Sequence, residues 1–312
     1  MERALASCVI AARAAIIHTR RTKEEWVLTF AGMTVAILGL VAGPAAPAAA
    51  PAPAPTLKPV RIMTMNECAD ILLLQMVPKA RIASVTYRAH DAIQWIEPGL
   101  DAGVPINHGS AEEIVAEKPD LIIAGDFSTA VTKRVARAAG APLIEIRSAT
   151  SFEDIRQITR QVGAAVGEPQ RADALIAEMD ATLASLAASR PPRPFVVAAW
   201  SGDSVPGRKT LANAIIEAAG AVNIASKLDT ETYNSFGAEE LLAARPDVLM
   251  YGATSASKPS LTDAQNGLLM RIYAGRRITY PETLYNCGVP QSAKAALDLR
   301  RALVAVEGRG RR

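Results

Sequence analysis

The chain alternates between short apolar runs and segments in which apolar residues recur at helical spacing. The runs at 121–124 and 248–251 do not alternate with polar residues, which is typical of strands covered on both faces in a parallel sheet. We expect such strands at residues 61–65, 82–86, 121–124, 143–146, 195–199, 248–251 and 277–280. Because helical segments separate these strands, the pattern predicts an α/β fold with mostly parallel sheets.

A motif of cap, short helix, Lys/Arg-Pro-Asp, apolar strand and glycine occurs twice, at residues 110–125 and 237–252. A solenoid repeats every ~20–50 residues, so two copies a whole domain apart indicate two similar lobes instead. The residue before a proline disfavours helical geometry, so each motif helix should end at Lys118 or Arg245.

Most polar residues of the motif have a local role. Glu113 follows Ser110 by three residues, which is the spacing of a capping box, and Glu240 has the matching position in the second copy. Glu112 and Glu239, one residue earlier, have no local role beyond favouring the positive end of the helix dipole. These two glutamates are therefore candidates for a function outside the helix.

Helical spacing dominates the stretch between the two motif copies. Apart from a break at 167–169, apolar positions recur helically, and the second part predicts one helix over 172–186. We interpret it as a rigid helical bridge joining two Rossmann-like lobes, with a ligand cleft between them. The expected parts are an N-terminal lobe, the bridge, a C-terminal lobe and a tail, at residues 60–150, 151–190, 191–306 and 307–312.

The N-terminal region has the features of an export signal. Residues 27–43 are apolar, follow a cluster of basic residues, and precede a stretch that is almost entirely alanine and proline. This order is typical of a secretory signal peptide, which we place at residues 1–48, followed by a linker at 49–59. We expect cleavage and a periplasmic protein, with retention of the segment as a membrane anchor as the alternative.

Composition and charge exclude some classes of function. Half of the 312 residues are hydrophobic, 21% are charged, and the net charge of +3 includes no basic tract of the kind that binds nucleic acid. His90 and His108, the histidines after the signal, lack metal-ligand spacing, and no Gly-x-Ser-x-Gly motif occurs. We therefore expect no enzymatic activity, no cofactor and no structural metal.

Aromatic residues follow several of the predicted strands. Open α/β sheets bind ligands beyond the carboxyl ends of their strands, so such residues would line a cleft for a bulky, partly apolar ligand. Ordinary packing of loops is the alternative for each of them. The aromatic candidates are Tyr87, Phe127, Trp200 and Tyr285, together with Tyr233 just before the second motif.

With these features, the chain resembles the periplasmic binding proteins of ABC importers for cobalamin and ferric siderophores. The segments that carry the resemblance are 61–70, 82–87, 111–123, the bridging helix and 238–249, and the likeness covers about residues 60–306. The resemblance implies capture of a metal chelate (a corrinoid, a ferric siderophore or haem) and its delivery to a permease with its ATPase subunits. We expect the protein to act as a monomer.

The resemblance also implies roles for particular residues. Members of this family dock on the permease through one surface glutamate per lobe, and the matching residues are Glu112 and Glu239. The positions that face the cleft in cobalamin-binding relatives are occupied by Ile106 and Tyr233, where Ile106 departs from an aromatic residue.

Other candidate ligand contacts lie in the same loops. Asn107 and His108 are candidates to compensate for Ile106, while Tyr87 and His90 are candidates to ligate iron or to hydrogen-bond a ligand. No cluster of arginines marks the expected cleft loops, so strongly anionic catecholate siderophores are not favoured.

Cys68 and Cys287 should both lie near the mouth of the cleft. In an oxidising compartment three states are open for them: a disulfide between the lobes, two free thiols, or contact with a ligand or metal. Two further interpretations of the whole protein also stay open, namely a chelate-processing enzyme and a sensor or adaptor anchored by residues 27–43.

Overall fold

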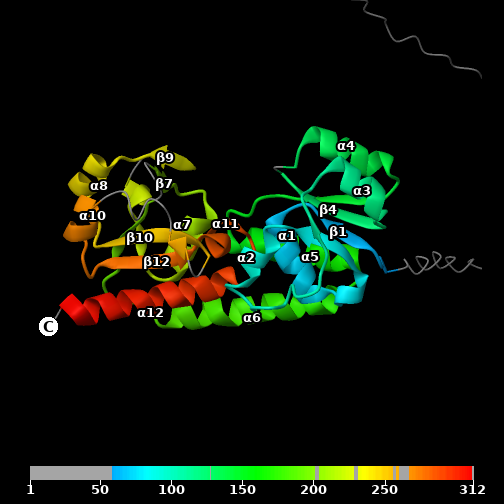
Figure 1. Ribbon diagram of the computed structural model, residues 1–312. Coiled ribbons are helices and arrows are strands. Elements are labelled where there is room, and N and C mark those ends of the chain that lie inside the picture. The colour runs from blue at the N-terminus through cyan, green and yellow to red at the C-terminus, as the bar shows by residue number, and fades with distance from the viewer. Residues whose placement is uncertain are drawn as a thin grey trace, which may run out of the picture. The chain divides into compact units, whose positions relative to one another are not determined.

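The computed structural model describes residues 58–126, 128–200, 204–227, 231–255, 258–259 and 267–310 (Figure 1). The expected signal peptide, most of the expected linker and the candidate Phe127 lie outside these residues. In the part of the chain that is described, no helix is both long enough and apolar enough to cross a membrane.

The first sheet is entirely parallel, with the strand order β3-β2-β1-β4-β5. Its strands are β1 (Ile62–Thr64), β2 (Ile82–Thr86), β3 (Ile106–Asn107), β4 (Leu121–Gly125) and β5 (Leu143–Ile146). Its helices are α1 (Glu67–Met76), α2 (Ala89–Ile93), α3 (Ala111–Glu117), α4 (Ala130–Ala138) and α5 (Phe152–Val166), with a 3-10 turn η1 (Lys79–Arg81). Strands β2 and β3 lie on one side of β1, and β4 and β5 lie on the other, so the strand order reverses between β1 and β4.

The second sheet has the order β11-β10-β6-β8, and β12 also pairs with β10. It consists of β6 (Val196–Ala199), β8 (Val222–Asn223), β10 (Val248–Ser255), β11 (Lys258–Pro259) and β12 (Arg277–Pro281), and only β11 is antiparallel. A separate antiparallel pair is formed by β7 (Ser204–Pro206) and β9 (Tyr233–Ser235).

The helical elements of this half are α7 (Leu211–Ala218), η2 (Ile224–Lys227), α8 (Ala238–Ala244), α10 (Gly267–Ile272), α11 (Glu282–Asn286) and α12 (Ser292–Gly310). The predicted α/β class, with two mostly parallel sheets and covering helices, is confirmed. The short strands β3 and β8 and the β7–β9 pair were not expected from the sequence.

The repeated motif forms α3 and β4 in the first half and α8 and β10 in the second. Ser110 Oγ accepts the Glu113 amide, and the Glu113 carboxylate accepts the Ser110 amide, so the capping box is complete. In the second copy Glu240 accepts a hydrogen bond from the Gly237 amide, but glycine has no side chain to accept the reciprocal bond from the Glu240 amide. Lys118 and Arg245 end the two helices as predicted.

The aspartate of each Pro-Asp pair hydrogen-bonds to the start of the adjacent strand in the sheet. Asp120 accepts hydrogen bonds from the amides of Val60 and Arg61, and Asp247 accepts one from the amide of Val196. Each carboxylate therefore holds the start of the neighbouring strand, β1 or β6, against the strand of the motif itself, β4 or β10. The motif thus aligns the centre of each sheet as well as starting a helix.

Helix α6 (Pro169–Ala188) packs against α5, α7 and α12, and it lies beside α12 in Figure 1. Its buried side chains belong to a single apolar cluster that also contains Ile62 of the first sheet and Val248 of the second. Both sheets therefore share one continuous core, and the described residues form one compact unit. The predicted helix at 172–186 is confirmed and extends somewhat further at both ends.

Candidate functional site

A cavity of about 630 Å³ lies at the carboxyl ends of the first sheet's strands. Residues that follow β1, β2, β4 and β5 line one side, and the segment from Glu282 to Gly288 lines the other. The strand order reverses between β1 and β4, and in open α/β sheets such a reversal leaves a crevice that binds ligands. The backbone topology thus creates the cavity, and loops of the second half close it.

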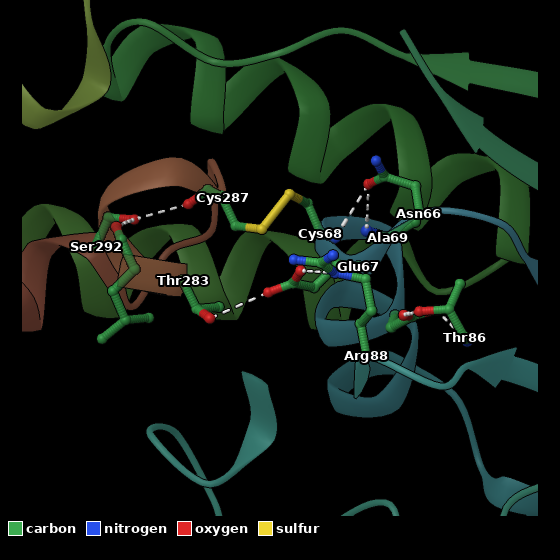
Figure 2. Close-up of a disulfide and its surroundings, with 11 residues drawn as sticks. Asn66, Glu67, Cys68, Ala69, Thr86, Arg88, Thr283, Cys287 and Ser292 are labelled. Carbon is green, nitrogen blue, oxygen red and sulfur yellow. Dashed lines mark hydrogen bonds and ion pairs between the residues drawn. A yellow bond between two sulfur atoms is a disulfide. The ribbon is translucent and has the colours of Figure 1, made fainter. Parts of the chain in front are cut away.

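Asn66 begins α1 directly after β1. Its side-chain oxygen accepts the amides of Cys68 and Ala69 at 3.0 and 3.1 Å, which is the hydrogen bonding of a helix N-cap (Figure 2). The chain therefore turns into helix at the strand end, and Glu67 and Cys68 lie in the first turn, at the wall of the cavity.

Cys68 and Cys287 form a disulfide, with their Cα atoms 5.0 Å apart (Figure 2). Of the three states left open by the sequence, the structure has the bond between the two halves. The carbonyl of Cys287 accepts a hydrogen bond from Ser292 Oγ, which also bonds to Leu284 O. The first turn of α12 thereby holds the cysteine loop in place.

Two polar links accompany the disulfide. Glu67 accepts hydrogen bonds from Arg88 Nε at 2.7 Å and from Thr283 Oγ1 at 3.1 Å, and these bonds can be followed in Figure 2. The side-chain amides of Gln75 and Gln291 also hydrogen-bond to each other. The hydrogen bond to Glu67 raises the pKa of the Arg88 guanidinium. One wall of the cavity is therefore joined to the other covalently and by hydrogen bonds.

Tyr87 and His108 form an aromatic surface at the cavity. Their rings are stacked, with centroids 5.5 Å apart and planes at 17°, and both residues belong to the lining. The Tyr87 side chain is 55% exposed, and His108 Nδ1 lies 3.3 Å from Glu113 Oε1. Among the aromatic and histidine candidates that are described, this pair alone lines the cavity.

Trp200 and Tyr285 are not available to a ligand in this cavity, which corrects the expectation for both. Trp200 is 3% exposed; its amide still bonds to Met250 O in the sheet, and its indole Nε1 donates to Phe236 O at 2.8 Å. Because it continues the register of β6, its side chain is directed into the core of the second half. Tyr285 is also 3% exposed and packs on Tyr280, with ring centroids 4.4 Å apart.

Tyr233 and His90 lie outside the cavity lining. Tyr233 is on β9 and is 61% exposed. His90 Nδ1 lies 2.8 Å from Asp101 Oδ2, and this hydrogen bond raises the pKa of the imidazole. Their roles in ligand binding stay predictions, as does that of Phe127.

Several charged residues line the cavity that were not among the site residues predicted from the sequence. They are Glu67, Arg88, Asp91, Asp126, Arg147 and Glu282. Asp126, Arg147 and Glu282 each come directly after a strand, so the strand-end rule applied to the aromatic residues would also have found them. Within the described part of the chain, no three His, Cys, Asp or Glu residues are grouped so as to hold a metal ion.

Glu112 and Glu239 occupy equivalent places on the surface. Each is the second residue of its helix, α3 or α8, and each is exposed. Among the ion pairs of the described residues, none involves either glutamate. Their carboxylates are therefore accessible to a partner.

Comparison with known proteins gives a consistent picture. A family model described as "Periplasmic binding protein" matches residues 75–266. The chain is 26% identical over 203 residues to a cobalamin-binding protein of Halobacterium salinarum, a match that covers 64% of this chain and 55% of the relative. The match thus spans little more than half the length of that curated relative.

Solved structures resemble nearly the whole described chain. The periplasmic heme-binding protein RhuT from Roseiflexus sp. RS-1 superposes with a TM-score of 0.67 at 25% identity, covering 79% of this chain and 98% of RhuT. The periplasmic vitamin B12 binding protein BtuF of Vibrio cholerae superposes with a TM-score of 0.60 at 14% identity, covering 80% and 98%. The similarity to BtuF concerns the fold alone.

Proposed function

The chain belongs to the periplasmic binding protein family, and on that premise we propose that it captures a metal chelate and delivers it to the permease of an ABC importer. The observation that supports this proposal is the cavity of about 630 Å³, lined from both halves of the molecule. Its volume is in the range of small-molecule sites. The ligand class is a corrinoid, a ferric siderophore or haem, and the protein binds it without transforming it.

Two features support a periplasmic location. The apolar segment at residues 27–43 has the composition of a signal peptide. The disulfide between Cys68 and Cys287 is of a kind that persists in oxidising compartments and is rare in the cytosol. In this proposal the exported protein carries its ligand from the periplasm to the membrane.

The proposed contact with the permease is made by Glu112 and Glu239. Both carboxylates are exposed, and they have equivalent positions in the two copies of the motif. Two negative charges at fixed separation would meet basic residues of the permease and set the orientation of docking more than its strength. Helix α3 and helix α8 would then lie at the interface.

The ligand proposal is tested by isolating the protein from the periplasm of its native host. We expect an absorption band of the chelate and about one metal ion per protein, and both should return when the stripped protein is titrated with that chelate. If the isolated protein carries no chelate, and the stripped protein binds no corrinoid, haem or ferric siderophore, the proposal is wrong.

A further inference from the structure

The charged side chains of the cavity are unequal in number. Two guanidinium groups, Arg88 and Arg147, belong to the lining. The lining carboxylates are Glu67, Asp91, Asp126 and Glu282. The balance of these charges decides which chelates can enter, because a ligand in the cavity loses part of the water that would otherwise screen it.

Both guanidinium groups are already engaged by carboxylates. Arg88 Nε lies 2.7 Å from Glu67 Oε2, so this pair is neutral as a unit. Arg147 Nη2 lies 2.6 Å from Oδ1 of Asp154, at the start of α5, and donates to Gln157 Oε1 at 2.7 Å. Each arginine therefore already balances one carboxylate, and its positive charge is not left over to attract an anionic ligand.

Three carboxylates remain after this pairing. Asp91 is on α2, Asp126 follows β4, and Glu282 is the first residue of α11, so they reach the cavity from three different elements. Asp126 accepts the Ser148 amide, but among the described residues none of the three takes part in an ion pair. Burial raises the pKa of Glu282, and the nearby Glu67 raises it further.

Some stretches of the second half lie outside the described residues, and their amino-acid sequences contain no basic residue. Residues 201–203, 228–230, 256–257 and 260–266 contain no lysine or arginine, whereas they contain three aspartates. A cationic contribution from these stretches to the cavity is therefore excluded by their composition.

We infer that the cavity selects a neutral or positively charged chelate, one that presents carboxamide or ammonium N–H groups to Asp91, Asp126 and Glu282. Chelates with an anionic periphery, such as carboxylates or catecholates, are rejected because they would be held against Asp91, Asp126 and Glu282, which form no ion pair with any residue that the structure describes. Rejection by like charge is an effective way to separate ligands of similar size. This inference rests on the proposed function.

The test compares four chelates on the exported protein after removal of its ligand. The probes are aquacobalamin, a ferric trihydroxamate with a free ammonium group, haemin, and a ferric tricatecholate. We expect at least one of the first two to bind, and both anionic probes to bind about tenfold more weakly or worse. Raising the salt concentration from about 0.02 M to about 0.3 M should weaken binding of a cationic probe that binds.

Variants assign the selectivity to the carboxylates. Glu282→Gln and Asp91→Asn should each lower the affinity for a cationic probe about threefold or more. Each should also raise the affinity for haemin relative to the affinity for the cationic probe. Glu178→Gln, which neutralises an exposed carboxylate of α6 outside the cavity, is the matched control and should change neither. The salt dependence is measured on the unaltered protein and needs no variant to fold.

The outcomes separate the two proposals. If haemin or the ferric tricatecholate binds as tightly as aquacobalamin or the ammonium-bearing trihydroxamate, or if the variants leave these relative affinities unchanged, the charge selectivity is wrong while chelate capture stands. If none of the four chelates binds, both proposals fail.

Discussion

Asp70 is fully buried in α1, and the pKa of its carboxyl group is strongly raised. Its carboxylate accepts hydrogen bonds from the hydroxyls of Thr64 and Thr86 and from the Thr86 amide. Burial raises its pKa to about 7, and these hydrogen bonds only partly offset that effect. Thr64 and Thr86 end β1 and β2, so Asp70 connects α1 to the strand ends that lead into the cavity.

This carboxyl should make stability depend on pH. Between about pH 4 and pH 7 the unfolded chain releases the proton of Asp70 while the folded protein retains it. The folded state then binds more protons, so its stability falls as pH rises through this window, by about 4 kcal/mol at most. Below the window the effect is absent, and above it the loss is complete.

Asp70→Asn should remove this component, because the amide is nearly isosteric and does not titrate. Urea unfolding at several pH values should show a flatter profile between about pH 4 and pH 7 for the variant than for the parent protein. Asp173→Asn, which changes an exposed carboxylate on α6, should leave the profile as it is. Parallel profiles for Asp70→Asn and the parent would contradict the assignment.

At the scale of elements, the two motif helices end in the same unusual conformation. Lys118 and Arg245 have φ of 48° and are the non-glycine residues with positive φ in the described chain. A side chain in this left-handed region costs roughly 1–2 kcal/mol, which glycine avoids. The strain is tolerated at both places because the following proline and the aspartate that secures the next strand fix the turn.

Lys118→Gly should therefore stabilise the protein. The gain from removing the side chain exceeds the loss from a more flexible unfolded chain, and we expect a net increase of about 0.5–1 kcal/mol in the free energy of unfolding. Lys118→Ala keeps the Cβ atom and the strain, so it serves as the matched control and should give no such gain. A larger stabilisation from alanine than from glycine would show that charge, not backbone strain, governs this position.

At the scale of the whole molecule, the disulfide joins residues 219 positions apart in the sequence. It connects α1 in the first half to the loop before α12 in the second, beside the Glu67–Thr283 and Gln75–Gln291 hydrogen bonds. Closing so long a loop reduces the entropy of the unfolded chain, and it also limits how far the two walls of the cavity can separate.

Replacing both cysteines, Cys68→Ser with Cys287→Ser, should lower the free energy of unfolding by about 2–5 kcal/mol. The ligand-free variant should also open further, which small-angle scattering would detect as a larger radius of gyration. Reductant should have the same effect on the parent protein and none on the variant. Two titratable thiols in the unreduced, unfolded parent protein would contradict the bond.

The docking proposal is also a matter of the whole molecule. Glu112→Ala combined with Glu239→Ala should lower chelate-dependent ATPase activity of the reconstituted importer about tenfold or more, because both docking contacts are removed. Binding of the chelate to the isolated protein should not change. Glu217→Ala, an exposed carboxylate on α7, is the control. Normal chelate-dependent ATPase activity with the double variant would contradict a role for these glutamates in docking.

Features that depend on neighbours along the chain could be predicted from the amino-acid sequence. The apolar runs located the main strands, Ser110 and Glu113 located a capped helix, and the repeated motif indicated two similar halves. These signals are local, since a cap or a proline acts within one turn. The short strands β3 and β8 escaped detection because two residues carry no period that a pattern can show.

Which side chains face the ligand, and which distant residues pair, depends on how the segments pack in three dimensions. Trp200 and Asp126 both follow strands, yet Trp200 lies in the core and Asp126 lines the cavity, because the packing of helices on each sheet determines which strand-end residues are covered. The pairing of Cys68 with Cys287, and of Arg88 with Glu67, likewise depends on how distant segments meet. The charge that a ligand meets is the sum of such pairings, and no single stretch of sequence contains it.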